Sequence, residues 1–339
     1  MYKNNHWKKA SCLMLLAVML LLNACSAAQI SPTAQAANSR LKVGIVLSDI
    51  GLGDQSFSDG AFNGLIRARD EGKIKFDYRE ISDTKTYDEA FKQLLDEHND
   101  VIIGLGYAVK ESLETIAKSN PNQQFLLIDE KSDLANVASI TFKEEEGSFL
   151  AGALAAMASK TGELGFIGGI ETPLLHKFQS GFEQGARAIN PNAQFTINYT
   201  GDFGKPELGA SAAKDMIDNH NTDVIYTVAG LTGVGGLQQA QKQGVYSIGV
   251  DSDQFFLAEK SVITSMIKNI DVALYNTTQT YIDNNRKFPE KDMVFGLQDG
   301  GVGLAPVHVI ELTDEQQKKL DELKQQLISG DITIQLDAS

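Results

Sequence analysis

Acidic side chains stand directly after several short apolar runs of this 339-residue chain. Asp49, Asp129 and Asp251 each follow such a run, and Lys268 ends the stretch 264–268. The two oxygens of a carboxylate can accept both hydroxyl donors of a vicinal diol, and a lysine could neutralise one of these acids. The pattern predicts a site for a hydroxyl-bearing ligand, while capping of the following segment is the alternative for Asp251.

Aromatic residues accompany these acids. Phe57 opens a helix-like stretch, where its ring could stack on a flat ligand or lie in the core between helix and sheet. Asp54 or Ser56 could cap the same helix. Tyr107 follows the apolar run Val101–Leu105 and is placed for the same role as the acids. These residues add an aromatic surface to the predicted site.

The turn 229–236 is rich in glycine and joins an apolar run to a helix-like stretch. Its Gly233-x-Gly235 start is followed by Gln238, where a dinucleotide fingerprint needs a third glycine, and it lacks the Gly-Lys-Ser/Thr end of a P-loop. Backbone amides near Gly230 and Thr232 could still approach a ligand closely. The turn indicates either ligand contact or a tight strand–helix connection, not a nucleotide cofactor site.

Motifs for catalysis and metal binding are missing from the sequence. Its five histidines show no H-x-x-x-H or comparable spacing, no G-x-S-x-G nucleophile elbow occurs, and Cys12 and Cys25 are the only cysteines. The acidic run 144–146 suits the start of a helix and is interpreted as structural. We therefore expect no metal, no cofactor and no enzymatic activity.

Apolar β-branched runs alternate with amphipathic stretches from Leu41 onward. This alternation predicts parallel sheets covered by helices on both faces, and ligands of such sheets bind at the carboxyl ends of the strands. About eight units suit two sheets, with a first crossing near Thr141, and a (β/α)₈ barrel is the alternative. The expected strands are Lys42–Leu47, Phe76–Ile81, Val101–Leu105, Phe125–Ile128, Leu164–Gly168, Phe195–Tyr199, Val224–Val228 and Tyr246–Val250. The expected helices are Phe57–Glu71, Tyr87–His98, Val109–Ser119, Gly147–Ser159, Leu175–Ile189, Leu208–Asn219 and Val234–Gln243.

The N-terminus is basic and then apolar, and its apolar run 11–22 is too short to span a bilayer. It ends Leu22-Asn23-Ala24-Cys25, which resembles a bacterial lipobox, where the cysteine is lipidated and becomes the new N-terminus. We expect residues 1–24 to be a lipoprotein signal peptide and 25–40 a lipidated flexible linker rich in Ala, Ser, Gln and Thr. A cleaved secretory signal with an incidental cysteine is the alternative. The expected location is the cell membrane, lipid-anchored on its extracytoplasmic face, with palmitate among the acyl chains.

The chain is acidic throughout. Its formal net charge is −14, and it becomes −17 without the three lysines of the segment 1–24. Such a surface repels phosphate backbones, so nucleic-acid binding is disfavoured. It also offers no polybasic patch to lipid headgroups, so that membrane attachment would depend on the acyl chains at Cys25.

Seven motifs in order resemble the basic membrane protein (BMP) family of lipoproteins, which are substrate-binding proteins of ABC importers and include purine nucleoside receptors. Each motif is weak alone, but together they run from about Lys42 to Pro306. They are Asp49…Asp54-x-Ser56-Phe57, Glu145-Glu-Gly-Ser-Phe-Leu-Ala-Gly152, Gly168-Gly169-x-x-x-Pro173…Lys177-Phe178-x-x-Gly181-Phe182, Thr232-Gly233-x-Gly235, Gly249-Val-Asp-Ser-Asp-Gln254, Thr264-Ser-Met266…Lys268 and Gly300-Gly-Val-Gly-Leu-Ala-Pro306.

The resemblance implies the type I periplasmic-binding-protein fold, an α/β architecture of two doubly wound parallel-sheet lobes joined by three hinge crossovers. It places residues 41–141 with about 264–292 in lobe 1, and 142–263 with about 293–339 in lobe 2. It further implies a monomer without cofactor that captures a nucleoside between its lobes and delivers it to an ABC permease.

The resemblance also assigns roles within the site. Phe57 and Phe178 would stack on a purine, and Asp251 with Lys268 would hold ribose. Asp49 and Asp129 would form hydrogen bonds with the edges of the ligand. The remaining ligand-binding residues implied by it are Ser58, Tyr107, Gly230 and Thr232.

Two departures from the family pattern bear on base selectivity. Ser58 replaces an asparagine and cannot offer the paired donor and acceptor of an amide, and Leu231 replaces a glycine of the turn. These departures leave open a ligand-sensing regulatory lipoprotein of the same fold. A sugar-type ligand is a further alternative, because sugar-binding sites share an aromatic floor with nucleoside sites.

Overall fold

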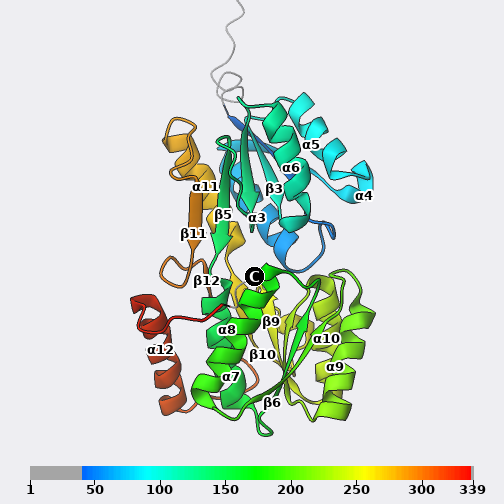
Figure 1. The fold of residues 1–339 in the computed structure, drawn as a ribbon, viewed down its shortest axis with the longest axis vertical. Helices are drawn as coiled ribbons and strands as arrows, with labels where there is room; N and C mark the ends of the chain where they lie inside the picture. The colour runs from blue at the N-terminus through cyan, green and yellow to red at the C-terminus, as the bar shows by residue number, and fades with distance from the viewer. Residues whose placement is uncertain (1–39, 337–339) are drawn as a thin grey trace, which may run out of the picture. The chain divides into compact units, whose positions relative to one another are not determined.

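Two six-stranded sheets organise residues 40–336, which are the part of the chain that the computed structural model describes (Figure 1). The first sheet has the order β11-β5-β4-β3-β1-β2, and its strands are all parallel. The second has the order β12-β10-β9-β8-β6-β7, in which β12 alone is antiparallel. The predicted α/β fold of two lobes is confirmed, and the alternative of a single barrel is wrong.

The strands include four that the sequence analysis did not predict, namely β5, β10, β11 and β12. The first sheet consists of β1 (Leu41–Val46), β2 (Ile74–Arg79), β3 (Val101–Leu105), β4 (Gln124–Ile128), β5 (Val137–Phe142) and β11 (Asp292–Phe295). The second consists of β6 (Glu163–Gly168), β7 (Gln194–Tyr199), β8 (Val224–Val228), β9 (Tyr246–Asp251), β10 (Val262–Lys268) and β12 (Val302–Leu304).

Helices connect the strands, and α4, α11 and α12 were absent from the prediction. Those of the first lobe are α3 (Phe57–Asp70), α4 (Ile81–Thr84), α5 (Tyr87–Asp96), α6 (Lys110–Ser119) and α11 (Ile270–Asp283). Those of the second are α7 (Glu144–Ala158), α8 (Pro173–Ile189), α9 (Pro206–His220), α10 (Gly230–Gln243) and α12 (Asp314–Ser329). Short 3₁₀ turns cover Tyr107–Val109 and Phe255–Leu257.

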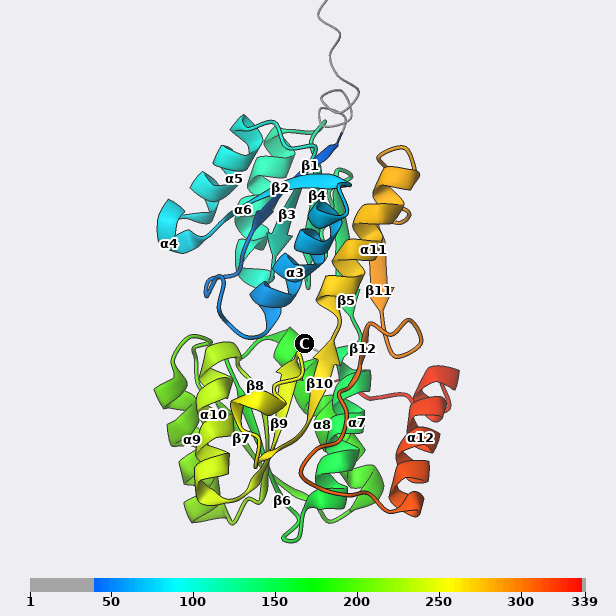
Figure 2. The same ribbon diagram turned by 180° about the vertical axis from the view of Figure 1, so that it is seen from behind.

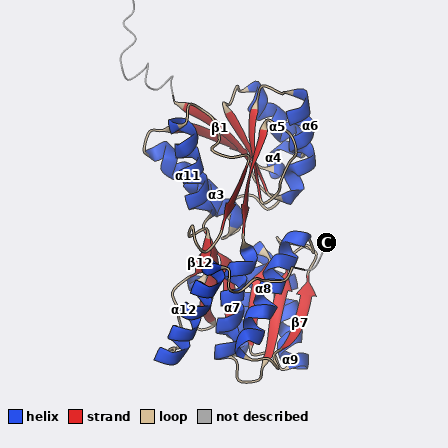
Figure 3. Ribbon diagram, turned by 60° about the vertical axis from the view of Figure 1, so that its left-hand side comes forward, coloured by secondary structure: helices blue, strands red, loops and turns tan. Residues whose placement is uncertain are grey.

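Side chains of successive strand residues point to opposite faces, and this divides the apolar residues of the first sheet between two helix layers. On β3, Ile103 belongs to the same buried cluster as Leu65 of α3, whereas Ile102 belongs to the cluster that contains Phe91 of α5 and Leu113 of α6. Figure 3 shows this sheet between α3 and α11 on one side and α5 and α6 on the other. Burial on both faces explains why the central strands β3 and β4 are almost continuously apolar.

The second sheet is covered in the same way by α7 and α8 on one face and α9 and α10 on the other. Helices α7 and α8 approach each other at glycines. A Cβ atom on Gly152 would lie 1.9 Å from the carbonyl oxygen of Phe182, and one on Gly185 would lie 1.8 Å from that of Phe149. Side chains at these two positions would push the helices apart, so the glycines are required by packing.

The chain passes between the sheets three times. The crossings follow Phe142 at the end of β5, Lys268 at the end of β10 and Phe295 at the end of β11. Figure 2 shows β10 leading directly into α11. The second and third crossings come a few residues later than the expected lobe boundaries of about 264 and 292, because β10 completes the second sheet as far as Lys268 and β11 joins β5 of the first.

No helix within residues 40–336 has the length and apolar character needed to cross a membrane. The predicted signal peptide, the predicted linker up to residue 39 and the predicted lipidation site Cys25 lie outside the described residues.

Candidate ligand-binding site

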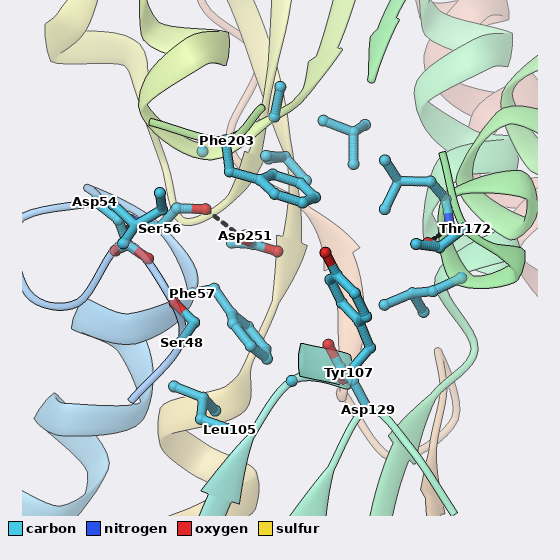
Figure 4. Close-up of a pocket in the computed structure, with 18 of the residues that line it drawn as sticks. Ser48, Asp54, Ser56, Phe57, Leu105, Tyr107, Asp129, Thr172, Phe203 and Asp251 are labelled. Carbon is cyan, nitrogen blue, oxygen red and sulfur yellow. Dashed lines mark hydrogen bonds between the residues drawn. The ribbon is translucent and has the colours of Figure 1, made fainter. Parts of the chain in front are cut away.

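A cavity of about 110 Å³ lies between the two lobes, at the carboxyl ends of strands from both sheets (Figure 4). This is the position at which open parallel sheets bind ligands, because the loops that follow the strands converge there. The lining residues are Ser48, Asp49, Ile50, Asp54, Ser56, Phe57, Leu105, Gly106, Tyr107, Ala108, Asp129, Thr172, Leu174, Leu175, Phe178, Phe203, Val228, Ala229, Gly230, Val250, Asp251 and Lys268.

Asp54 organises the edge of the cavity that the first lobe supplies. Its carboxylate accepts hydrogen bonds from the backbone N–H groups of Ser56, Ser58 and Asp59 at 3.0, 2.7 and 3.2 Å. These are amides that the start of α3 would otherwise leave unpaired, so Asp54 caps the helix and Ser56 does not. Burial raises the pKa of Asp54 to about 6, against the lowering effect of the three amides. The capped turn directs the Phe57 ring into the cavity.

Two aspartates occupy matching places at the ends of strands. Asp129 follows β4 and Asp251 ends β9, and both have left-handed backbone angles, with φ of 68° and 66°. Such angles are uncommon for residues other than glycine and are found where the surrounding structure imposes them, often at functional sites. Burial raises the pKa of both carboxyls, although the charge of Lys268 opposes this shift.

Lys268 is buried and holds several carboxylates together. Its Nζ lies 2.6 Å from Oδ2 of Asp129 and 3.1 Å from Oε1 of Glu144. Burial alone would lower the pKa of Lys268, but the charges of Asp129, Glu144 and Asp251 outweigh burial and raise it. The lysine is therefore charged at neutral pH, and the predicted pairing of Lys268 with a carboxylate is confirmed.

The charge network continues behind the cavity. Glu144, the first residue of α7, is fully buried, and its Oε2 lies 3.1 Å from Nζ of Lys177. Lys177 also donates to the carbonyl oxygen of Phe142, at the first crossing between the lobes. The acidic run 144–146 forms the first turn of α7, as expected, and its first residue also pairs with Lys268.

One carboxylate oxygen at this site has no hydrogen-bond partner within the described residues. Oδ1 of Asp129 is buried and has no hydrogen-bond partner among residues 40–336, while Oδ2 is taken by Lys268. A buried acceptor left unpaired is costly, so such an atom in a cavity wall favours a ligand that donates a hydrogen bond.

Four aromatic residues line the cavity. Figure 4 shows Phe57 and Tyr107 from the first lobe and Phe203 from the second pointing into the same space. Phe178 also lines the cavity but is only 3% exposed, and its ring lies 5.9 Å from Nζ of Lys268. The rings offer flat apolar surfaces from both lobes.

Eight of the ten residues predicted to bind the ligand line the cavity, and Ser58 and Thr232 do not. The hydroxyl of Ser58 lies on the buried side of α3 and pairs with that of Ser48 at 2.7 Å. The hydroxyl of Thr232 is fully buried and accepts a hydrogen bond from the backbone of Lys205 at 2.9 Å. Both side chains support loops around the cavity.

Phe203 and Thr172 line the cavity and were not predicted. Phe203 lies in the loop between β7 and α9, and Thr172 lies between β6 and α8, where it caps α8 through the amide of Leu175 at 3.3 Å. Both positions follow a strand of the second sheet, so the rule that located the aspartates would also have located them.

Within residues 40–336 no three His, Cys, Asp or Glu side chains are grouped as metal ligands. The acids of the cavity face a lysine, aromatic rings and backbone instead.

Comparison with known proteins places the chain among transport proteins. The family model described as ABC transporter substrate-binding protein PnrA-like matches residues 41–337. Basic membrane protein A of Borreliella burgdorferi is 34% identical over 287 residues, which cover 83% of this chain and 84% of that protein. The CD4+ T-cell-stimulating antigen of Listeria innocua is 32% identical, with 86% of this chain and 87% of that protein covered.

Solved structures agree with these sequence matches. A solute-binding protein of an ABC transporter system from Aeropyrum pernix superposes with a TM-score of 0.80 at 25% identity, covering 88% of this chain and 94% of that one. A transcriptional activator of the comK gene from Bacillus halodurans gives a TM-score of 0.73 at 21% identity, over 88% of this chain and all (100%) of that one. At that identity, the second match shows the shared fold alone.

Proposed function

This chain belongs to the PnrA-like family of ABC transporter substrate-binding proteins, to which the basic membrane proteins are related, and we propose that it captures a purine nucleoside between its lobes. The protein would deliver that nucleoside to an ABC importer while held at the outer face of the membrane by acyl chains on Cys25. The observation that carries the nucleoside proposal is a cavity that combines opposed aromatic rings with buried carboxylates.

The rings account for the base. Phe57 and Phe203 come from different lobes, and Figure 4 shows both rings facing the cavity from opposite sides of the cleft. A planar base that stacks on both would be held by both halves of the protein, and aromatic stacking adds about 0.5–1.5 kcal/mol per ring to the area buried. A ligand that contacts both lobes favours the closed arrangement over the open one.

The carboxylates account for the sugar. Asp129 and Asp251 lie near the same ammonium group, and Oδ1 of Asp129 has no partner within the described chain. Ribose hydroxyls are neutral donors, and carboxylate acceptors bind them without a second charge being buried. The charge of Lys268 opposes the rise in pKa that burial causes in both acids, and its ammonium group pairs directly with Asp129. It also lies 5.0 Å from the centre of the Phe57 ring.

The charge balance favours a nucleoside over a nucleotide. Among the described residues that line the cavity, Asp49, Asp54, Asp129 and Asp251 are acids and Lys268 is the single base. That base is already paired with two carboxylates, so a phosphate would meet net negative charge and no free cation. Like charges in a water-poor cleft repel strongly, so phosphorylated ligands are disfavoured.

A thermal-shift panel tests the proposal. The purified protein is heated with inosine, guanosine, adenosine, cytidine, uridine, inosine 5′-monophosphate, ribose or glucose, each at millimolar concentration. A ligand that binds only the folded protein raises the melting temperature by mass action. We expect purine nucleosides to stabilise it most and inosine 5′-monophosphate to have little effect. Stabilisation by ribose or glucose alone would reassign the site to sugars.

The anchor needs a separate test. Cells grown with radiolabelled palmitate should incorporate label into the wild-type protein, and the variant Cys25→Ser should be unlabelled and released from membranes. Incorporation of label into the variant, or its retention on membranes, would contradict lipid anchoring at this cysteine.

A further inference from the structure

The turn before α3 contacts the opposite lobe directly. The carbonyl oxygen of Gln55 accepts hydrogen bonds from Oγ of Ser252 at 3.1 Å and from Nε2 of Gln254 at 3.2 Å. The next residue, Ser56, donates its hydroxyl proton to Oδ2 of Asp251. The first-lobe turn 55–56 and the second-lobe loop 251–254 are thus joined by three hydrogen bonds, two of which meet at one backbone carbonyl.

On the first lobe, the hydroxyl of Ser56 is free for this contact because another residue caps the helix. Ser56 occupies the N-cap position of α3, yet its side chain makes no capping hydrogen bond within residues 40–336. Asp54 accepts the amides instead. Gln55 has a left-handed φ of 56°. The turn therefore uses its hydroxyl and its carbonyl across the cleft, not within its own helix.

On the second lobe, Gln254 is fixed in position by its own surroundings. It is 2% exposed, its Oε1 accepts from the backbone of Val250 at 3.0 Å, and its backbone N–H donates to Ser265 at 3.0 Å. A Cβ atom at Gly249 would lie 2.8 Å from Oε1 of Gln254, so only glycine leaves room for this side chain. The amide is held with its N–H group directed at the carbonyl of Gln55.

We propose that the turn 55–56 and the loop 251–254 form a closure contact that sets how long the ligand stays bound, with Gln55, Ser252 and Gln254 acting as positioning residues outside the ligand cavity. The identity of the ligand in this inference rests on the proposed function of the cleft. The contact between the two lobes does not depend on it. Gln55, Ser252 and Gln254 do not line the cavity. Their effect is on the equilibrium between open and closed lobes, and a ligand enclosed by both lobes leaves only from the open form.

The size of the effect follows from the number of hydrogen bonds. Loss of one neutral hydrogen bond that forms only in the closed protein lowers the equilibrium constant for lobe closure about 2- to 10-fold. Ser252→Ala removes one bond, and because Ser252 is exposed the variant should fold normally. Ser56→Ala removes a second bond, which is to the carboxylate of Asp251, and Ser56, unlike Ser252, also lines the cavity. We expect inosine to dissociate about 2- to 10-fold faster from Ser252→Ala and faster still from the double variant, with little change in the association rate.

Two substitutions serve as matched controls. Ser211→Ala removes an exposed hydroxyl of α9 in the same lobe as Ser252, and Gln55→Asn changes the side chain but keeps the carbonyl that accepts both bonds. Asparagine also tolerates a left-handed backbone. Both controls should release inosine at the wild-type rate.

The lobe distance is measured on the same full-length variants by double electron–electron resonance. Spin labels are attached at Lys118→Cys of α6 and Lys214→Cys of α9, which are exposed and lie on the side of the molecule away from β11 and α12 (Figure 1). Cys12 and Cys25, the only cysteines, are replaced by serine. We expect Ser252→Ala and the double variant to shift the distance distribution towards longer values, and the two controls not to.

Distances and dissociation rates that equal the wild-type values in Ser252→Ala and in the double variant would overturn the closure contact. If the wild-type protein binds no inosine and the label distances still lengthen in the variants, the nucleoside proposal is wrong and the closure contact stands. The two failures are therefore distinguishable.

Discussion

Removal of the buried ammonium group tests the electrostatic account of the site. Lys268→Met keeps the length of the side chain and removes its charge. The ammonium contacts Asp129 at 2.6 Å and Glu144 at 3.1 Å, and all three residues are less than a tenth exposed. Breaking a buried ion pair from one side costs about 3–5 kcal/mol, because the remaining charge has no partner. We expect the free energy of unfolding at pH 8 to fall by that amount.

The deficit should depend on pH in a defined direction. Burial already raises the pKa of Asp129, and the attraction of Lys268 limits the rise, so the pKa climbs further without the lysine. An acid whose pKa is higher in the folded than in the unfolded state destabilises the fold as pH rises above its unfolded value. Each further unit corresponds to about 1.4 kcal/mol. Lys268→Met should therefore lose less stability at pH 5, where a carboxyl can remain protonated, than at pH 8.

Urea unfolding followed by circular dichroism at both pH values measures the effect. Lys92→Met is the matched control, since Lys92 forms a surface pair with Asp96 in which both side chains are more than half exposed, at 61% and 63%. Such pairs contribute about 0–1 kcal/mol. A deficit below about 1 kcal/mol for Lys268→Met, or one that is the same at pH 5 and pH 8, would refute the reasoning.

Three further predictions concern the cavity, the cap of α3 and the packing of α7. Asp251→Asn should weaken inosine binding, measured by calorimetry, about 10- to 100-fold, because a charged acceptor is lost. The control Asp133→Asn, at an exposed position, should bind inosine as the wild type does. Equal affinities of Asp251→Asn and the wild type would show that Asp251 does not hold the ribose. Asp54→Ala should lower the free energy of unfolding by about 1–3 kcal/mol, because three backbone N–H groups lose their acceptor. Ser56→Ala should lower it less, because that variant removes only the hydrogen bond to Asp251, and the reverse order would reassign the cap. Gly152→Ala should lower the free energy of unfolding in urea by about 1–3 kcal/mol, because the new Cβ would lie 1.9 Å from a carbonyl oxygen of α8. An unchanged midpoint would show that α7 and α8 can move apart without loss of stability.

The strands that the sequence predicted well are the central ones. Val101–Leu105 and Val224–Val228 have the predicted bounds, because both are buried on both faces and continuously apolar. The missed β10 contains Thr264 and Ser265, whose hydroxyls are satisfied by Ala305 at 2.8 Å and Gln254 at 3.0 Å. Such partners are distant in the sequence, so a polar residue within a buried strand cannot be recognised from local pattern alone.

The site was predicted to a similar extent and for related reasons. The strand-end rule located Asp49, Asp129 and Asp251, because the parallel strands of each sheet end at one edge and those edges of both sheets border the cavity. Ser58 was assigned to the ligand from motif position, but a helix turns its second residue away from its first, so Phe57 faces the cavity while Ser58 faces Ser48. Which side of a helix faces a cleft depends on how the helix packs.

Calorimetric titration of the wild-type protein with inosine and with inosine 5′-monophosphate tests the central claim most directly, because the two ligands differ only by the phosphate. The account predicts that inosine binds at one site per chain. The monophosphate should bind at least about tenfold more weakly, since about 1.4 kcal/mol of repulsion raises the dissociation constant tenfold. Equal or tighter binding of the monophosphate, or no binding of inosine, would contradict the proposal of a cleft for uncharged nucleosides.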